Sequence, residues 1–451
     1  MGPSLTKSVP KVLHLVAGWP MLAHVLDAVS AATTGMPVNI VVVVGHGANQ
    51  VQETFPSGPP GDRSLRFVEQ SQQLGTGHAV LQAAPLLDET VPTLVLYGDV
   101  PLIRSATLQR LFAAGGDVAL LTVQLAQPAG YGRIVRDWHG NVLRIVEERD
   151  ADEDERKLTE VNTGILIAPT AKLKRWLKAL SNDNEQREYY LPDVIAQAVA
   201  ERCRVIAVEC SDPDETRGVN SKEQLATVER IAQRRVASEL MECGTTLADP
   251  ARIDVRGKVK VGTDVSIDVG CVFEGQVDLA DGVRVGAYCV LRNCSVGAGT
   301  ELLPFSHLDG ATIGAAARIG PYSRLRPGVH LSDEVHIGNF VEVKASTVGR
   351  ASKANHLAYL GDATVGANVN IGAGTITANY DGARKHRTVI GDDVSIGSNA
   401  VLVAPITIGQ GATIAGGSTI SKSAPEGKLT VARAKQTTLE GWKRPTKEKK
   451  E

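Results

Sequence analysis

Apolar residues in the first half of the chain gather in short runs that end in glycine or in polar residues. The clearest runs are residues 39–45, 93–99 and 161–168, and each has the length of a strand buried on both faces. Between them lie segments such as residues 21–34, where apolar residues are three and four positions apart, as in a helix. This alternation predicts an α/β domain over residues 1–221 with a Rossmann-like mixed sheet.

One long helix is predicted next. From Lys222 to about Cys243, large apolar residues recur near the 3.6-residue period of an amphipathic helix. This apolar stripe consists of Leu225, Val228, Ile231, Val236 and Leu240. We interpret residues 222–244 as a helical linker between two domains.

After Asp249 the apolar period becomes six. Large apolar residues recur at this spacing in three registers, and a smaller residue often follows four positions later, as at Cys271 and Cys289. The registers are Val255, Val261, Ile267, Phe273, Leu279, Val285 and Leu291; then Ile313, Ile319, Leu325, Leu331, Ile337 and Val343; then Ile390, Ile396, Leu402, Ile408, Ile414 and Ile420.

A strand repeats every two residues and a helix every 3.6, so neither alone gives a period of six. Three strand-plus-corner units per coil do give it, with one side chain of each unit pointing into a triangular prism. The pattern therefore predicts a hexapeptide parallel β-helix over residues 245–451. The number of matching positions argues against the alternative, a β-sandwich with coincidental spacing. We interpret Cys271 and Cys289 as small core residues rather than nucleophiles.

Composition excludes several classes of protein. The formal net charge is only -2, from 48 basic and 50 acidic residues, and aromatic residues make up 4% of the chain. This balance argues against a nucleic-acid binder, and six scattered cysteines without a CxxC pair argue against a disulfide scaffold or a zinc site. No apolar run approaches the roughly 20 residues of a membrane helix, and no secretory pattern is present. We expect a cytoplasmic protein without membrane insertion.

The six-residue count fails between Thr347 and Gly361, and we expect this segment to project as a surface loop. It contains His356, and the polar residues Lys344 and Asn370 lie on either side of it in the sequence. One interpretation is a surface loop with an incidental histidine. The other is a base beside groups that bind an anion and a sugar, and we favour it.

Short motifs in both halves resemble one known family, the bifunctional bacterial N-acetylglucosamine-1-phosphate uridyltransferase and glucosamine-1-phosphate N-acetyltransferase. The motifs cover residues 10–14, 73–78, 97–99, 130–133, 162–164 and 218–220, then 324–328, 338–342 and 356–359. The resemblance covers nearly the whole length. It implies a left-handed β-helix, synthesis of UDP-N-acetylglucosamine for the cell wall, and a homotrimer with sites between subunits.

For the first half, the resemblance implies that a sugar phosphate attacks the α-phosphorus of UTP and releases pyrophosphate. Such chemistry depends on alignment and charge neutralisation. The resemblance places Mg²⁺ on Asp99 and Asn220, whose oxygens suit this ion, and it gives Lys11 the role of offsetting phosphate charge. The implied uridine and sugar contacts are Gln70, Gly75, Thr76, Tyr97, Gly98, Gly132, Glu147 and Asn162.

For the second half, the resemblance implies acetyl transfer from acetyl-CoA to the sugar amine, with His356 as the base that deprotonates the amine. A backbone N–H between Gly372 and Gly374 could face the oxyanion. Arg326, Lys344, Tyr359 and Asn370 would hold the glucosamine phosphate. Ala373, Asn379, Tyr380, Ser398, Gly416 and Arg433 would hold acetyl-CoA.

The beginning of the chain departs from the family. Residues 2–5 stand where the family has the end of a glycine-rich phosphate loop, and the preceding first strand is not in the sequence. Either the recorded start lies downstream of the true one or this is a damaged copy. In both cases we expect weak uridyl transfer, retained acetyl transfer and a sheet with an uncovered edge.

Two other functions are compatible with the sequence. One is an acetyltransferase alone, with a remnant nucleotidyl domain. The other is a non-catalytic regulatory protein that binds a sugar nucleotide. His356 argues against the second, because a sensor needs no base.

Overall fold

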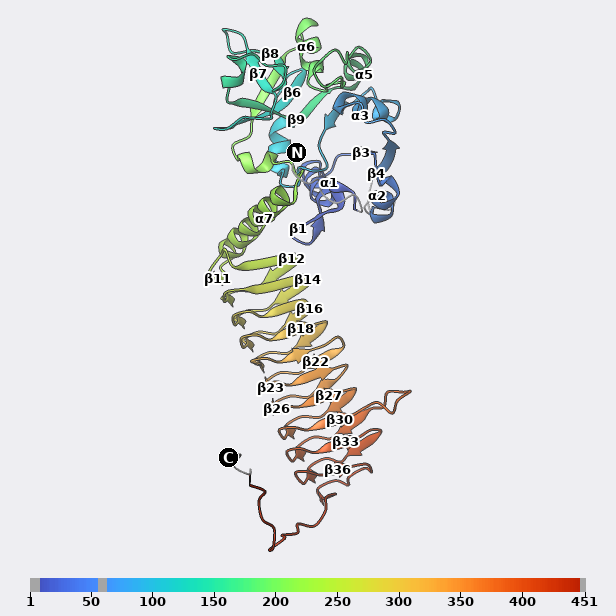
Figure 1. The fold of residues 1–451 in the computed structure, drawn as a ribbon, viewed down its shortest axis with the longest axis vertical. Coiled ribbons are helices and arrows are strands. Elements are labelled where there is room, and N and C mark those ends of the chain that lie inside the picture. Colours follow the sequence, from blue (N-terminus) through green and yellow to red (C-terminus); the bar gives the residue numbers. More distant parts are fainter. Residues whose placement is uncertain (1–8, 56–62, 447–451) are drawn as a thin grey trace, which may run out of the picture. The chain divides into compact units, whose positions relative to one another are not determined.

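A computed structural model describes residues 9–55 and 63–446, and its contacts divide the chain into two compact units, residues 1–233 and 234–451. Figure 1 shows the mixed α/β part of the first unit and the stacked coils of the second. The division falls within helix α7 (Lys222–Glu242), the helix that the sequence predicted. The domain bounds of 1–221 and 245–451 stay predictions.

The first unit contains a six-stranded mixed sheet in the order β10-β6-β9-β7-β8, with β5 also paired to β9. Strand β10 runs parallel to β6, whereas β9 is antiparallel to β5, β6 and β7. The strands are β5 (Pro92–Val95), β6 (Val118–Gln124), β7 (Arg133–Arg136), β8 (Val142–Val146), β9 (Glu160–Pro169) and β10 (Val205–Glu209). The helices are α1 (Met21–Ala32), α2 (Ala48–Thr54), α3 (Thr76–Ala83), α4 (Ser105–Phe112), α5 (Thr170–Lys178) and α6 (Asp193–Ala200). The predicted mixed sheet is confirmed.

A second, two-stranded sheet in this unit consists of the parallel strands β3 (Val38–Val44) and β4 (Arg63–Glu69). Among the described residues, no strand connects β3 to β5. A cavity of about 880 Å³ is lined by apolar side chains of both strands and of α1 and α3. Among the described residues, one edge of β3 and one edge of β5 therefore have no strand partner, and the uncovered edge expected from the sequence stays a prediction. Residues 1–8, where the departure from the family was placed, lie outside the described residues.

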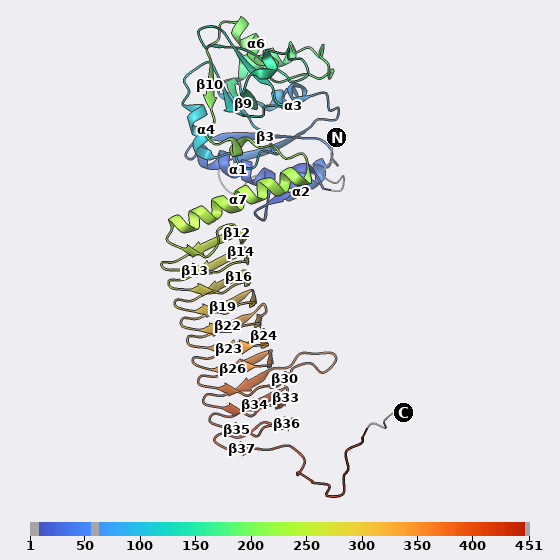
Figure 2. The same cartoon turned by 60° about the vertical axis from the view of Figure 1, so that its left-hand side comes forward.

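The second unit is a parallel β-helix, seen from two sides in Figures 1 and 2. One face is an eleven-stranded parallel sheet. Its strands are, in order, β11 (Thr246–Leu247), β13 (Ser266–Ile267), β15 (Arg284–Val285), β17 (Glu301–Leu302), β20 (Arg318–Ile319), β23 (His336–Asn339), β26 (Lys353–His356), β29 (Asn370–Ile371), β32 (Ser395–Ile396), β35 (Thr413–Ile414) and β37 (Leu429–Thr430). Strands on the other two faces include β21 (Arg324–Leu325), β24 (Glu342–Lys344), β27 (Tyr359–Gly361) and β30 (Ile376–Ala378), which follow one another coil by coil. The long strands β12 (Ile253–Val261), β14 (Cys271–Leu279) and β16 (Val290–Val296) pair with one another at the start of the β-helix.

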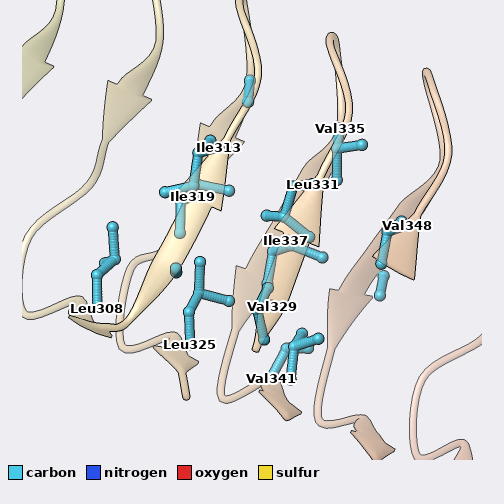
Figure 3. Packing of buried hydrophobic residues seen from close by; sticks show 14 of the residues in the cluster. Leu308, Ile313, Ile319, Leu325, Val329, Leu331, Val335, Ile337, Val341 and Val348 are labelled. Carbon is cyan, nitrogen blue, oxygen red and sulfur yellow. The ribbon is translucent and has the colours of Figure 1, made fainter. Parts of the chain in front are cut away.

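The six-residue period marks the core of this β-helix, as predicted. Figure 3 shows Ile313, Ile319, Leu325, Leu331 and Ile337 among the buried side chains, and each is at most 4% exposed. Cys271 and Cys289 are also buried, and desolvation raises the pKa of their thiols to about 11 and about 12. Both thiols therefore stay protonated at neutral pH and pack as small core residues.

The predicted loop at residues 347–361 was wrong. This segment forms ordinary coil strands, β25 (Thr347–Val348), β26 (Lys353–His356) and β27. The six-residue count fails there only because one repeat is shortened by a residue, so that Val348 follows Val343 in the core. The true excursion is the segment 379–387 between β30 and β31 (Thr388–Ile390), which projects from the coils in Figures 1 and 2.

Exposed aromatic residues form a ladder along one corner of the β-helix. The rings of Tyr288, Phe305, Tyr322 and Phe340 stack with centroids 5.2, 5.0 and 5.4 Å apart. Each of these residues has a positive φ, and Leu357 occupies the next corner position with a φ of 51°. The ladder thus repeats one corner geometry over successive coils.

No helix in the two described stretches of the chain combines the length and the apolar character needed to traverse a bilayer.

Candidate active sites

The predicted metal ligands of the first unit lie close together. Asp99 follows β5 and Asn220 precedes α7, and the ammonium group of Lys11 contacts the side-chain oxygens of both. A cation already bridges the two oxygens, so this donor set can converge on a positive ion. The described residues contain no group of three or more His, Cys, Asp or Glu side chains able to hold a metal by themselves. A metal ion here would need waters and substrate phosphates to complete its shell.

The beginning of helix α7 fixes Asn220. Gln224 accepts hydrogen bonds from the backbone N–H groups of Asn220 and Ser221, at 2.6 and 3.1 Å, and its own N–H donates to Ser221 Oγ at 3.1 Å. This is a capping box, recognisable in the sequence as serine followed three residues later by glutamine. The Val219 N–H donates to the Asp99 carbonyl oxygen at 3.1 Å, which ties the two predicted ligands together.

A second cluster surrounds the start of helix α3. Gln70 Nε2 donates to the Gly75 carbonyl oxygen at 3.1 Å, and Thr76 Oγ1 accepts from the Leu191 N–H at 3.1 Å. Gly75 has a φ of 106°, a conformation that favours glycine. Desolvation raises the pKa of Tyr97 to about 12, although a hydrogen bond with Thr76 opposes the shift. The phenol therefore remains a hydrogen-bond donor at neutral pH.

A third cluster joins Gly132, Glu147 and Asn162. The Asn162 N–H donates to the Gly132 carbonyl oxygen at 2.8 Å, and a Cβ at Gly132 would lie only 3.1 Å from Glu147 Oε1. Burial raises the pKa of Glu147, and two nearby aspartates add to this shift. Gly164, with a φ of 80°, lies against the Tyr97 ring, where a Cβ would overlap it. The second and third clusters are therefore in contact.

In the second unit, the predicted phosphate-binding residues lie on successive coils. Arg326 Nη1 donates to Glu342 Oε1 at 2.9 Å, and Lys344 Nζ lies 3.3 Å from Asp362 Oδ2. Asn379 Nδ2 donates to the same oxygen of Asp362. This face therefore presents a guanidinium and an ammonium group that are held in place by carboxylates.

The excursion 379–387 adds a cation that sequence analysis missed. Its ends are joined by a β-bridge between Tyr380 and Lys385, and Asp381 accepts hydrogen bonds from the backbone within the turn. Lys385 reaches Lys344, and the hydrogen bond and positive charge of Lys344 lower the pKa of Lys385. A signal for this residue existed, because the excursion is the longest break in the six-residue repeat.

His356 lies at the end of β26, on the eleven-stranded face. Its ring Nδ1 is 2.9 Å from Asn339 Oδ1, and Asn339 is its direct ladder partner on β23 (His336–Asn339). Asn370, on β29 (Asn370–Ile371), lies on the same face, opposite Lys353. Sequence analysis missed Asn339 as a partner of the predicted base.

The predicted acetyl-CoA residues continue along the coils below His356. The Ala373 carbonyl oxygen accepts from the Asn399 N–H at 2.7 Å, and the Ser398 carbonyl oxygen accepts from the Gly417 N–H at 2.8 Å. Arg433 Nη1 donates to the Gly416 carbonyl oxygen at 2.7 Å, so Arg433 is held beside these coils.

The contacts of the turn at residues 372–374 indicate which of its backbone N–H groups is available as the predicted oxyanion donor. The N–H groups of Gly372 and Gly374 are engaged by carbonyl oxygens of neighbouring coils, at 2.8 and 3.4 Å. Among the described contacts, the N–H of Ala373 has no backbone acceptor. Ala373 is therefore the residue of this turn best able to face an oxyanion.

The structure divides the predicted acetyl-transfer residues between two faces. Arg326, Lys344 and Tyr359 lie on or directly after β21, β24 and β27, whereas His356 and Asn370 lie on the eleven-stranded face. The corner at Leu357 separates the two groups. Tyr380 is 62% exposed and donates to the Gly382 carbonyl oxygen within the excursion.

Both halves of the chain are similar to known proteins. Residues 1–166 match the family described as MobA-like NTP transferase domain, and residues 387–422 match bacterial transferase hexapeptide repeats. The chain is 58% identical over 453 aligned residues to the bifunctional protein GlmU of Cupriavidus pinatubonensis and to that of Ralstonia pickettii. Each alignment covers 100% of this chain and 98% of the relative. It is 57% identical to the bifunctional protein GlmU of Azoarcus sp., over 99% of this chain and 98% of the relative.

Proposed function

The chain belongs to the GlmU family of bifunctional proteins, and on that premise we propose that it makes UDP-N-acetylglucosamine in two steps. The first step transfers acetyl from acetyl-CoA to glucosamine-1-phosphate, and the second transfers uridylyl from UTP to the N-acetylated product. The observation that carries this proposal is the identity of 58% over the whole chain, which includes both the NTP transferase and the hexapeptide parts.

Acetyl transfer depends on a base, because a protonated amine cannot attack a thioester. His356 Nε2 takes a proton from the sugar amine, the amine nitrogen attacks the thioester carbon, and the C–S bond breaks to release CoA. The Ala373 N–H faces the developing oxyanion. Arg326, Lys344 and Lys385 offset the charge of the sugar phosphate.

Uridyl transfer depends on alignment and on neutralised charge. The sugar-phosphate oxygen attacks the α-phosphorus of UTP while pyrophosphate leaves, and Lys11 offsets negative charge at this centre. The contacts to the uridine and the sugar come from Gln70, Gly75, Thr76, Gly132, Glu147 and Asn162. Tyr97, which contacts Thr76 and Gly164, joins these residues, and Gly98 follows it in the chain.

Asp99 and Asn220 would hold Mg²⁺, which when bound supplies charge neutralisation on the phosphates. The contact of one lysine ammonium group with both oxygens supports this donor set. UTP and acetyl-CoA are metabolites of the cytoplasm, so we place the enzyme there.

We also propose a homotrimer. The division of the acetyl-transfer residues between two faces supports it, because His356 of one subunit would then meet the phosphate-binding face of another. Three faces of similar shape suit cyclic packing.

Two variants test the two activities separately. We expect His356→Ala to lose acetyl transfer by roughly a hundredfold or more while its uridyl transfer stays at the level of the unmodified chain. Asp99→Asn should give the reverse result. CoA release and pyrophosphate release are the two measurements. A His356→Ala variant that still acetylates glucosamine-1-phosphate at the parental rate contradicts the proposal. The weak uridyl transfer expected from the sequence stays a prediction, and the pyrophosphate assay on the unmodified chain checks it.

A further inference from the structure

The side chain of Asn339 forms a hydrogen bond with His356, the predicted base. Its Oδ1 lies 2.9 Å from His356 Nδ1, and the two residues are direct partners in the parallel ladder between β23 and β26. An amide oxygen can only accept a hydrogen bond, so this contact requires the proton on Nδ1. The lone pair of the neutral ring is then on Nε2.

We propose that Asn339 is a positioning residue for acetyl transfer: it fixes the orientation and the tautomer of His356 so that Nε2 is the basic nitrogen. This inference rests on the proposed function and deepens it. It also assigns a specific acceptor, a neutral amide rather than a carboxylate. A neutral acceptor selects the tautomer and places no negative charge beside the ring.

The corner of the coil keeps the pair in register. Phe340 and Leu357, which follow Asn339 and His356, both have a positive φ, of 57° and 51°. The Leu357 N–H donates to the Asn339 carbonyl oxygen at 3.1 Å, and the Phe340 ring stacks on Tyr322 at 5.4 Å. The backbone on both coils is therefore fixed directly beside the two side chains, which limits how far the ring and the amide can move apart.

Within the described part of one chain, few charged side chains lie near the His356 ring. The coil above contributes Asn339, and the coil below contributes the Gly374 N–H, which donates to the His356 carbonyl oxygen at 3.4 Å. The titratable groups on the same two strands, His336 and Lys353, oppose each other three residues away along the ladder. Glu342 lies across the corner, where Arg326 engages it. Among the described contacts, no carboxylate forms an ion pair with His356.

Two substitutions of Asn339 distinguish an effect on the His356 tautomer from an effect on the stability of the coil. Asn339→Leu removes the acceptor at similar size, and we expect kcat for acetyl transfer to fall by about 10- to 100-fold while KM for both substrates stays unchanged. Asn339→Asp keeps the acceptor but adds a negative charge, which favours the protonated ring. The acidic limb of its pH–rate profile should therefore move to higher pH by roughly one unit.

Asn355→Leu is the matched control on the same strand as His356, since Asn355 shows no side-chain hydrogen bond in the described part of the chain. It should leave kcat and the pH profile unchanged, and the thermal midpoints of all three variants show whether the coil is intact. A folded Asn339→Leu variant with parental kcat, or an Asn339→Asp variant with an unmoved acidic limb, overturns the inference. If the Asn339 variants give such a result, His356→Ala shows which hypothesis has failed. An active His356→Ala variant contradicts the proposed function as well, whereas an inactive one contradicts only the role of Asn339.

Discussion

Lys385 shows how much a single side chain can add to a site. It stands beside Lys344, and the carboxylate of Asp362 lies near both ammonium groups. A sugar phosphate would supply the missing negative charge. We expect Lys385→Gln to raise KM for glucosamine-1-phosphate by roughly two- to fivefold with little change in kcat, because the contact is exposed to solvent. Initial rates at varied sugar phosphate measure this. Lys428→Gln, an exposed lysine far along the coils, should have no effect, and an equal rise in KM in both variants would contradict the assignment.

The same lysine predicts a dependence on pH. The positive charge of Lys344 lowers the pKa of Lys385, so Lys385 loses its proton at a lower pH than an ordinary lysine does. As pH rises, KM for the sugar phosphate should therefore begin to increase at a lower pH than it would if Lys385 had the pKa of an ordinary lysine. In Lys385→Arg the guanidinium stays charged, and this increase should be delayed. KM measured from pH 7 to 10 checks the order of the two curves, and coincident curves would contradict the prediction.

Among the elements, the aromatic ladder offers a direct test of what stabilises the coils. Phe305 lies between Tyr288 and Tyr322, with interplanar angles of 7° and 4°. Phe305→Ala removes both stacks and should destabilise the β-helix by about 1–2 kcal/mol, which corresponds to a fall in melting temperature of roughly 2–8 °C. Trp138→Ala is the control, because that side chain is 88% exposed and its one ring contact among the described residues is with His139. Equal melting temperatures for Phe305→Ala and the parent would show that the stacks contribute no stability.

The repeat made the β-helix predictable, because each coil imposes the same inward positions on its sequence. Ile319 and Ile337 could be placed in the core from spacing alone. Spacing could not distinguish a shortened repeat from an inserted loop, so the break at Val348 was mistaken for an excursion. Lys385 could not be placed because the hairpin returns it to Lys344, 41 residues earlier in the chain. Such a contact depends on the turn within the excursion rather than on the period.

Contacts across the chain explain the other misses. Asn339 and His356 are neighbours only because one coil places them in register, a relation that a motif search in one strand does not reveal. In the first unit, strands β3 and β5 were both predicted from their apolar runs. Their separation by a cavity of about 880 Å³ depends on which strands pair, and strand pairing follows from tertiary structure.

At the scale of the whole molecule, the division of the acetyl-transfer residues between two faces predicts complementation between inactive chains. Lys344→Gln damages the phosphate-binding face and leaves the His356 face intact, whereas His356→Ala does the reverse. In a trimer whose sites combine one face from each of two neighbours, random mixing at equal amounts gives each site an intact pair with a probability of one half times one half, or about one quarter. Co-expressed or co-refolded chains should therefore recover about a quarter of parental acetyl transfer, measured as CoA release per total chain. The mixture must contain mixed trimers, which differently tagged chains and sequential affinity capture can establish. If a single chain supplied both faces of its own site, no mixture could contain an intact site, and activity at the level of the separate variants would rule out a shared site.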